Sequence, residues 1–513
     1  MLLIICTIGK GPPFYAPDTE GYSKEYLIKT HSPQHLNKAL RLAGVELKNT
    51  RNLSGMMTAA TLSSRFQPTY VNKILKLLAF TYIVDYAILD DIVRPVTAHS
   101  QPDLGAFFEL QWQFGDSQDT PAAINLARAW EQAEGSPSTI IAVVDSGVRY
   151  DHPDLTGRLL TGYDFVSDPM QSNDGDGRDS DASDPGDGVS QEMAEYYQSV
   201  GTECKASKSS WHGTAVTSLI VGNGFTTNGL SGIDRYARVL PVRVIGQCGG
   251  RRSDLLDAIR WAAGVSDIHL PPNPTPARII NVSINILGNC TRADQDAIDD
   301  AVNSGAIIVV GAGNSGQDLA RSPTSPTSCR NVISVGAVNS KASRAIYSNY
   351  GAQIDLVAPG GESADGDGRE ILAASNTGLQ HAVQGNHYRR HAGTSMATPL
   401  VSGVLGLMLS ANTSLNNHTL YELLVSATRG FPKHSTAINC TSTTCGTGLL
   451  DAASAVRASF ESIYANDDTS SNPLGSDGFD DQQDTNIGAG TIDLWLLLLL
   501  CFFSRRNFEI VLN

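Results

Sequence analysis

Three short segments combine residue types that can perform nucleophilic catalysis. AVVDSGVRY carries Asp145 at the end of an apolar run, SSWHGTAV carries His212, and HAGTSMATP carries Ser395. A serine hydroxyl becomes an effective nucleophile when an imidazole accepts its proton, and a carboxylate fixes the tautomer of that imidazole. The three segments therefore contain the groups needed for acyl transfer. Taken singly, each is also typical of an ordinary helix cap or strand end.

The elements around these residues predict how they come together. Short Val- and Ile-rich runs end at Asp145, Asn285 and Asn314, and helix-like segments such as SDLLDAIRWAAGV lie between them. Continuous apolar strands separated by helices predict an α/β fold, a parallel sheet with helices on both faces. Functional groups gather at the carboxyl ends of such strands. His212 and Ser395 are expected at helix starts, where backbone N–H groups can stabilise an oxyanion.

Size, charge and cysteine usage narrow the class of protein. The chain has 513 residues, 41% of them hydrophobic and 17% charged, which predicts one large globular domain with smaller attachments. Its formal net charge of −15 argues against a nucleic-acid partner, because phosphate attraction needs a basic face. Six of the eight cysteines lie in the presumed folded region, which favours disulfides in an oxidising compartment. Buried free thiols in a cytosolic enzyme are the alternative.

The chain divides into five regions by sequence character. Residues 1–23 begin with a short apolar run, which indicates either a degenerate export signal or a start that lies upstream. Residues 24–101 predict a small α+β module, and residues 102–460 contain the alternating strands and helices. Residues 461–490 are an acidic, flexible linker, and residues 491–513 contain an apolar run followed by two arginines. That run is about half of the ~20 residues that a membrane helix needs.

Taken together, the motifs DSG, HGT and GTSMATP, in this order, resemble the peptidase domain of the subtilisin family over most of residues 102–460. The resemblance implies a secreted serine endopeptidase in which Asp145 orients, His212 acts as general base and then acid, and Ser395 is the nucleophile. Asn314, in VVGAGNSG, matches the family's oxyanion asparagine. The resemblance implies no cofactor for catalysis. A calcium-loaded surface protein with a relict protease fold is the alternative, and it would need a broken triad.

The resemblance also places a substrate cleft that binds an extended peptide by strand addition. Two backbone rails and the first specificity pocket are implied, together with a residue beside the nucleophile: Ser283, Ile284 and Asn285; Gly249 and Gly250; Gly311, Ala312 and Gly313; and Thr394. The family usually has Gly-Gly where Asn285-Ile286 stand, which leaves the subsite preference open. Ala215 stands where a second His usually follows HGT, a difference that we interpret as packing variation.

The loop SNDGDGRDSDASDPGDG concentrates carboxylates, the ligands that Ca²⁺ prefers on Gly-containing turns. The resemblance to secreted Gram-negative subtilases, which carry a similar DGDGRD insertion, favours a structural calcium ion; a solvated acidic loop is the alternative. The candidate ligands are Asp174, Asp176, Asp179, Asp181, Asp184 and Asp187. The same resemblance implies the disulfides Cys204–Cys248, Cys290–Cys329 and Cys440–Cys445.

The two ends of the chain carry further resemblances. VDYAILDDIVRP is similar to the family's inhibitory propeptide, with Ile88-Leu89 in place of the usual Glu-Pro, so residues 24–101 are expected to act as an intramolecular inhibitor. The tail resembles the GlyGly-CTERM sorting signals of Gram-negative bacteria, which implies a transient membrane tether and then release or display at the cell surface. We expect protein and peptide substrates and a monomer. Broad digestion of environmental protein is the leading interpretation, and dedicated processing of few surface proteins is the second.

Overall fold

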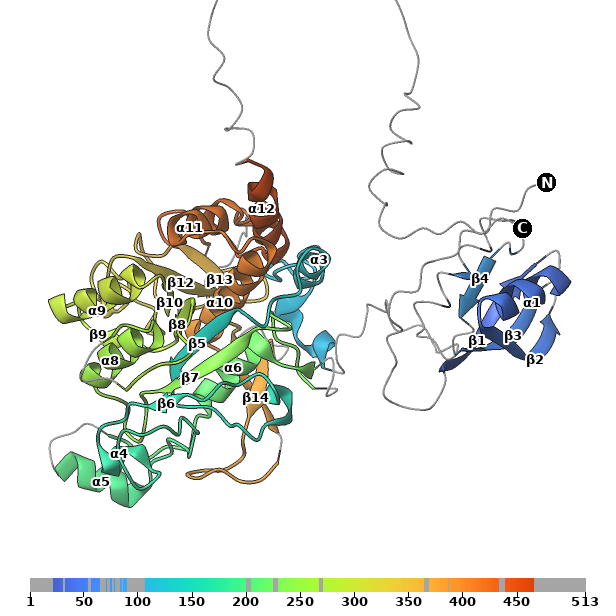
Figure 1. Ribbon diagram of the computed structural model, residues 1–513. Helices are drawn as coiled ribbons and strands as arrows, with labels where there is room; N and C mark the ends of the chain where they lie inside the picture. Colours follow the sequence, from blue (N-terminus) through green and yellow to red (C-terminus); the bar gives the residue numbers. More distant parts are fainter. Residues whose placement is uncertain are drawn as a thin grey trace, which may run out of the picture. The chain divides into compact units, whose positions relative to one another are not determined.

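The computed structural model describes residues 22–30, 33–53, 57–64, some positions between 71 and 89, and residues 107–465 with short gaps at 200–203, 225–228, 267–270, 364–368, 386 and 433–438. The chain divides into two units, Met1–Ser100 with Ser476–Asn513, and Gln101–Gly475. Figure 1 shows the helices and strands of both. The signal region expected at the amino terminus lies almost wholly outside the described residues, and the tail expected at the carboxyl terminus lies wholly outside them.

The small unit is an antiparallel sheet with one long helix among its described residues. The strand order is β2-β3-β1-β4, and Leu36 and Leu40 of the helix share a core with Ile28 and Leu62 of the sheet. An α+β unit is what the sequence predicts here, although the polar strands β2 and β3 carry too few apolar residues to be recognised. The elements are β1 (Tyr22–Lys29), α1 (Pro33–Leu42), β2 (Val45–Leu53), β3 (Met57–Ser64) and β4 (Tyr86–Leu89).

The large unit is built on a seven-stranded sheet in which each neighbouring pair is parallel, which confirms the predicted α/β fold. Its order is β13-β12-β10-β8-β5-β7-β6. The chain adds β7 on one side of β5 and β8 on the other, and such a switch point opens a crevice at the carboxyl ends of the strands. The strands are β5 (Ile140–Asp145), β6 (Tyr163–Asp164), β7 (Arg238–Arg243), β8 (Ile279–Val282), β10 (Ile307–Gly311), β12 (Val332–Val338) and β13 (Leu356–Pro359).

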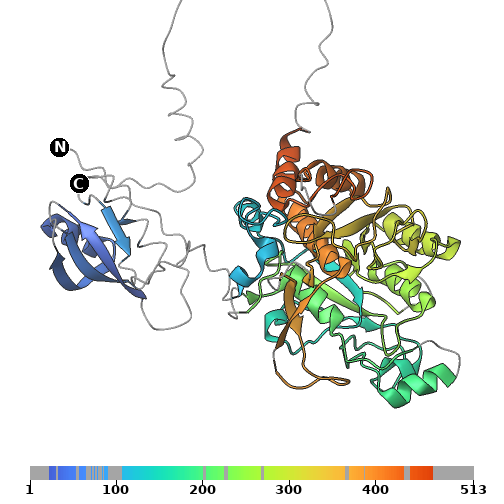
Figure 2. The same ribbon diagram turned by 180° about the vertical axis from the view of Figure 1, so that it is seen from behind.

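Helices cover both faces of this sheet because successive apolar side chains of its strands point to opposite faces. Ile141 and Val143 of β5 belong to a core with α6 (His212–Val221) and α10 (Thr394–Ala411). Ala142 and Val144 belong to a second core with α8 (Arg252–Ala262) and α9 (Arg292–Asn303). Successive strand residues point to opposite faces, so a strand buried on both sides is apolar throughout. Figure 2 shows the same helices and sheet from behind.

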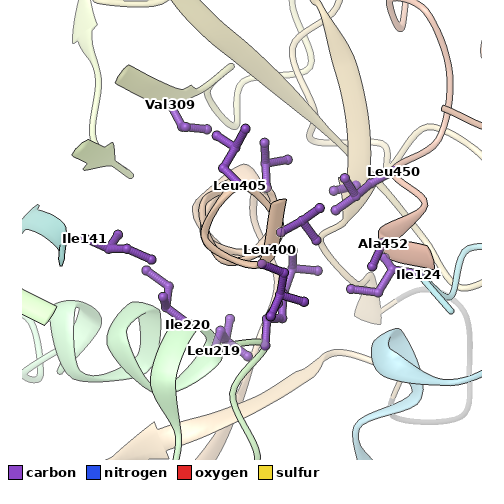
Figure 3. Packing of buried hydrophobic residues seen from close by; sticks show 14 of the residues in the cluster. Ile124, Ile141, Leu219, Ile220, Val309, Leu400, Leu405, Leu450 and Ala452 are labelled. Carbon is purple, nitrogen blue, oxygen red and sulfur yellow. The ribbon is translucent and has the colours of Figure 1, made fainter. Parts of the chain in front are cut away.

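Helix α10 is the centre of the first core. It is apolar and, at 18 residues, long enough to cross a membrane, but most of it is buried inside this protein. Figure 3 shows Leu400 and Leu405 among Ile141 and Val309 of the sheet and Leu219 of α6. The apolar composition of α10 therefore reflects its burial in the hydrophobic core of the large unit.

Shorter elements complete the large unit. A two-stranded sheet, β14 with β15, leads into α10, and α12 runs past the expected start of the acidic linker. They are η2 (Phe108–Leu110), η3 (Trp112–Phe114), α3 (Leu126–Trp130), η4 (Pro153–Leu155), α4 (Pro169–Ser172), α5 (Gln191–Ser199), β9 (Ile286–Leu287), β11 (Thr324–Ser325), β14 (Ile371–Ser375), β15 (His387–His391), α11 (Asn417–Ser426) and α12 (Ala452–Ala465).

Candidate active site

Asp145 is the last residue of β5 and is 1% exposed. The backbone N–H of Ser146 donates to its Oδ1 at 2.7 Å. His212 Nδ1 lies 2.8 Å from Oδ1 and 2.9 Å from Oδ2 of the same carboxylate. An Nδ1–H that donates to a carboxylate leaves Nε2 as the proton acceptor of the neutral imidazole. This pair is therefore arranged as a general base with its orienting acid.

The backbone before His212 turns this side chain toward Asp145. Trp211 has φ 54° and ψ 35°, in the left-handed region, and His212 is the first residue of α6. Such a conformation is costly for a bulky residue and persists only where the surroundings hold it. The Trp211 side chain is buried, and its Nε1–H donates to the Gly378 carbonyl at 3.0 Å. The buried indole thus fixes the point at which α6 begins.

Two glycines allow β5 and α6 to meet this closely. A Cβ on Gly213 would lie 2.1 Å from the Gly147 carbonyl oxygen and 3.2 Å from Asp145 Cβ. Gly147 itself has φ 89°, a region that favours glycine. The glycines of the DSG and HGT motifs therefore allow the close contact between Asp145 and His212.

Electrostatics around His212 favour its protonated form. Burial alone would lower the pKa of His212, but the Asp145 carboxylate, followed by Asp187 and Asp184, raises it above its ordinary value of 6.5. A second imidazole, that of His391 in β15, is affected in the opposite way. Burial, then the charges of His212 and Arg389, lowers the pKa of His391 to about 4, so this side chain is neutral near pH 7.

Ser395 is the second residue of α10 and is partly exposed. Pro399 in the same helix has no N–H, so the Ser395 carbonyl lacks its ordinary intrahelical donor. The Ser283 hydroxyl donates to this carbonyl at 3.1 Å, and Asn281 Nδ2 donates to the Ser283 hydroxyl at 3.0 Å. The proline of GTSMATP therefore frees a carbonyl that ties the start of α10 to the residues at the end of β8.

The amide of Asn314 has a defined orientation beside Ser395. Its Oδ1 accepts from the Thr394 N–H at 2.8 Å and from the Thr394 hydroxyl at 3.0 Å. Because Oδ1 makes both contacts, the Nδ2 amino group remains available as a donor. A Cβ on Gly393 would lie 3.3 Å from that Nδ2 and 3.6 Å from Ser395 Oγ. The amino group and the nucleophile thus flank one glycine, where a carbonyl oxygen can approach both.

Thr394 differs from the sequence-based expectation. Its side chain is buried, and its hydroxyl also accepts from the Gly313 N–H at 3.1 Å. The Thr394 hydroxyl has given its one proton to Asn314 Oδ1 and is buried, so it has no proton to donate to a peptide in the cleft. We therefore assign Thr394 to orienting Asn314 in place of the expected substrate contact.

The two expected rails line a common cavity of about 390 Å³, which includes Gly249, Gly250, Ile284 and Asn285. Ser283 is not among the residues that line this cavity, and its hydroxyl donates to the Ser395 carbonyl. The Asn285 side chain donates to the Gly311 carbonyl at 2.8 Å. The glycine-to-asparagine difference at this position therefore adds a fixed polar side chain between the rail formed by residues 283–285 and the end of β10.

Residues Gly311, Ala312 and Gly313 are buried at the end of β10. Gly313 has φ 98°, and a Cβ there would lie 2.6 Å from Asn349 Nδ2. Asn349 Nδ2 in turn donates to the Ala312 carbonyl at 2.9 Å. This segment directs the chain from the sheet to Asn314, and its small residues allow close packing against Asn349 and Thr394. The first specificity pocket expected beside it stays a prediction.

The six loop aspartates do not meet in one cluster. Within the described part of the chain, the one set of three His, Cys, Asp or Glu residues with ligand atoms within 4.8 Å of one another is Cys290, Asp294 and Cys329, and its two sulfurs form a disulfide. Asp174 pairs with the buried guanidinium of Arg243, which also binds Asp164. The six candidate calcium ligands therefore stay a prediction, and no three of them form such a set among the described residues.

The other aspartates of the loop fall into an exposed group and a group that contacts the protein near Asp145 and His212. Asp176 is exposed, and the neighbouring charge of Asp179, with smaller effects of burial and Asp174, raises its pKa. Asp181 accepts from the Ser183 N–H at 2.9 Å within the loop itself. Asp184 and Asp187 instead turn toward the segments that carry Asp145 and His212. Burial, with the Asp187 charge, raises the pKa of Asp184 to about 7.

Three disulfides close the large unit, Cys204–Cys248, Cys290–Cys329 and Cys440–Cys445, the pairs that the resemblance implies. The first joins the segment before α6 to the turn that carries Gly249 and Gly250. Cross-links of this kind stabilise mainly by restricting the unfolded chain.

Sequence reasoning did not single out Ser146 and His391, although both lie beside the triad. Ser146 is the middle residue of DSG, and its hydroxyl accepts from the Gly213 N–H at 3.0 Å. His391 precedes the nucleophile by four residues, and its Nε2 is buried without a hydrogen-bond partner among the described residues. Ser146 could have been found from the DSG motif. His391 could not, because only the folded chain brings it close to His212.

Two curated bacterial proteases are similar to this chain in sequence. An extracellular protease of Xanthomonas campestris is 39% identical over 349 residues, 68% of this chain and 55% of the relative. An extracellular basic protease of Dichelobacter nodosus is 36% identical over 379 residues, 73% and 58%. The chain thus spans little more than half the length of these curated relatives.

A solved protease structure from Pseudoalteromonas arctica is 38% identical, with a TM-score of 0.63, and the match covers 69% of this chain and 99% of that one. The model of the subtilase family of peptidases matches residues 136–489, more than half of the chain. With its parallel sheet and its DSG, HGT and GTSMATP motifs placed as described, the chain belongs to the subtilase family.

Proposed function

We propose that the protein is a secreted serine endopeptidase that hydrolyses peptide bonds through an acyl-enzyme on Ser395. The observation that carries this proposal is the pairing of His212 Nδ1 with the buried Asp145 carboxylate. Ser395 and the oriented amide of Asn314 flank Gly393 in the same unit. The extracellular relatives, and the three disulfides, support export to an oxidising environment.

In the first half-reaction, His212 Nε2 accepts the Ser395 hydroxyl proton while Oγ forms a bond to the peptide carbonyl carbon. The π electrons of the carbonyl move onto its oxygen, and this oxyanion accepts from Asn314 Nδ2 and the Ser395 N–H. The tetrahedral intermediate then collapses as the C–N bond breaks. The His212 imidazolium gives its proton to the leaving amine, and an ester remains on Ser395.

In the second half-reaction, water takes the place of the amine. His212 accepts a proton from the water, whose oxygen attacks the ester carbonyl carbon, and the same donors bind the second oxyanion. Collapse breaks the ester C–O bond and returns the proton to Ser395. Asp145 remains ionised throughout and stabilises each imidazolium.

The cleft supports protein and peptide substrates bound as an added strand. Two backbone segments, at Gly249-Gly250 and Ile284-Asn285, line the 390 Å³ cavity and can exchange main-chain hydrogen bonds with an extended chain. Ile245, Leu255 and Ile286 line this cavity together with Arg251, so its wall is of mixed character. Broad digestion, the leading interpretation, is supported by main-chain recognition, which does not depend on the side chains of the substrate.

Replacement of the nucleophile tests this function. Ser395→Ala should reduce casein and peptide hydrolysis by several orders of magnitude, a loss known from a bacterial subtilisin, while the folded domain keeps its unfolding midpoint. Ser304→Ala, at an exposed serine after α9, is the matched control and should retain full activity. Near-normal hydrolysis by the Ser395 variant would contradict the proposed triad.

A structural calcium ion fits only part of the acidic loop. Asp174, Asp176 and Asp179 carry hard oxygen donors, and the effect of its two neighbours on the pKa of Asp176 indicates that their charges repel. Arg243 already satisfies one side of Asp174. These three residues would hold the calcium ion, although their carboxylate oxygens do not all lie within 4.8 Å of one another in this structure. Asp181, Asp184 and Asp187 are left out because they accept hydrogen bonds from the protein itself. The ion would stabilise the loop and take no part in the reaction.

The remaining regions support a precursor. The four-stranded unit that ends before residue 101 is of the size expected for an inhibitory propeptide that the enzyme itself removes. The tail at 491–513, outside the described residues, is assigned to a transient membrane tether. Sequencing of both ends of the secreted form tests these two assignments: a mature chain that still contains residues 24–101 or 491–513 would refute the corresponding one.

A further inference from the structure

The last two acids of the loop contact the residues on either side of the catalytic pair. Ser146, which follows Asp145, donates its hydroxyl proton to Asp184 Oδ2 at 2.9 Å. The same hydroxyl oxygen accepts from the N–H of Gly213, which follows His212, at 3.0 Å. A hydroxyl has one proton, so the contact with Asp184 directs a lone pair of Ser146 toward Gly213. Asp184 thereby links the end of β5 to the first turn of α6.

Asp187 holds the chain on the other side of His212. Its Oδ1 accepts from the Ser210 N–H and its Oδ2 from the Ser210 hydroxyl, both at 2.6 Å. Ser210 is followed by the left-handed Trp211 and then by His212. Hydrogen bonds to a carboxylate are about twice as strong as neutral ones. A two-point contact at Ser210 therefore supports the unfavourable backbone turn that starts α6.

Close backbone packing makes this contact rigid. A Cβ on Gly186 would lie 2.0 Å from the Gln380 carbonyl oxygen, and one on Gly188 would lie 2.2 Å from the Leu379 carbonyl oxygen. The Gly188 N–H also donates to the Ser209 hydroxyl at 2.9 Å. The segment 184–188 is thus packed between the carbonyls of residues 379–380 and Ser209, which precedes His212 by three residues.

We propose that Asp184 and Asp187 are positioning residues for the catalytic pair, which clamp the start of α6 onto the end of β5 so that His212 Nδ1 faces the Asp145 carboxylate. This inference rests on the proposed endopeptidase function. The acidic loop then has two separate roles, because Asp176 and Asp181 are exposed, whereas Asp184 and Asp187 act through Ser146 and Ser210. Neither Asp184 nor Asp187 touches the reacting atoms in this arrangement.

The test compares Asp187→Ala and Ser146→Ala with the wild-type full-length chain. Small displacements of a catalytic group cost about 10- to 100-fold in rate, so each variant should lose about that factor in kcat on a peptide p-nitroanilide, with KM within about twofold. Asp187→Asn keeps one acceptor for the Ser210 N–H and should recover part of the loss. Glu192→Gln removes an exposed charge from α5, which follows the loop, and should leave both constants unchanged.

The result separates this inference from the proposed function. Thermal unfolding establishes that each variant is folded, and the Asn variant provides the measurement if the alanine variant fails to fold. The positioning roles alone would be overturned if the wild type is active but the Asp187 and Ser146 variants have the same kcat as Glu192→Gln. A change in KM without a change in kcat would overturn them too. A wild type without hydrolysis or Ser395 labelling by a fluorophosphonate would overturn the endopeptidase and this inference together.

Discussion

Removal of the Asn314 side chain tests the oxyanion site in isolation. Asn314 Nδ2 is free to donate because Thr394 engages the amide oxygen through two hydrogen bonds. Nδ2 acts on charge that exists only in the transition state, so Asn314→Ala should lower kcat and leave KM nearly unchanged. The expected loss is about 10²–10³, or about 2.7–4 kcal/mol, a magnitude known from a bacterial subtilisin.

A variant of Thr394, which orients Asn314, should lose less activity than Asn314→Ala and allows the two losses to be compared. Thr394→Val removes one of the two tethers of Asn314 Oδ1 and the acceptor of the Gly313 N–H, a loss of about 1 kcal/mol for each neutral hydrogen bond. We therefore expect a kcat loss of about 5- to 30-fold, below that of Asn314→Ala. Thr394→Ser retains the hydroxyl and is the matched control.

Steady-state kinetics on a peptide p-nitroanilide, with active enzyme counted by fluorophosphonate titration, measures these effects. If Asn314→Ala raised KM while kcat held, the residue would be a substrate-binding group and its proposed role would be wrong. Equal losses in the Val and Ser variants of Thr394 would contradict the orienting role of its hydroxyl.

Three further predictions follow from the site and the loop. Because the raised pKa of His212 belongs to the proton that must leave before catalysis, kcat/KM should rise with pH through an apparent pKa above 6.5. A limb at or below 6.5 would contradict the balance between burial, which lowers this pKa, and Asp145, Asp187 and Asp184, which raise it. The same shift stabilises the folded chain below pH 6.5, and this contribution is lost as pH rises through the folded pKa. Gly213→Ala forces a Cβ to 2.1 Å from the Gly147 carbonyl oxygen, so calorimetry should show a loss of about 1–3 kcal/mol together with reduced kcat, and an unaltered enzyme would refute the close packing. Chelation with EDTA should lower the melting temperature, since calcium at a hundredfold excess over Kd contributes about 2.7 kcal/mol, and identical curves for wild type and Asp176→Ala/Asp179→Ala with and without calcium would remove the ion from the account.

The sheet could be predicted because its strands carry their own signal. Runs such as STIIAVVD and AIIVVGAG are apolar on both faces and correspond to β5 and β10. Parallel strands place their carboxyl ends at one edge, which brought Asp145 and Asn314 to the same edge in the prediction. The antiparallel strands β2 and β3 were missed because their side chains are mostly polar.

Side-chain direction could not be predicted from the sequence. The sequence alone does not distinguish the six aspartates of the loop, yet Asp174 forms an ion pair with Arg243 and Asp187 accepts a hydrogen bond from Ser210. These partners are distant in sequence, so only the folded chain selects them. Thr394 shows the same limit, since its place beside Ser395 did not reveal that its hydroxyl faces inward to Asn314.

Covalent labelling of the folded protein tests the central claim most directly. A fluorophosphonate reacts with a serine only when that hydroxyl is activated by a base. Mass spectrometry of the labelled, proteolysed chain should find one adduct, on Ser395, and both Ser395→Ala and His212→Ala should abolish it. An adduct on another serine, or undiminished labelling after His212→Ala, would contradict the triad of Asp145, His212 and Ser395.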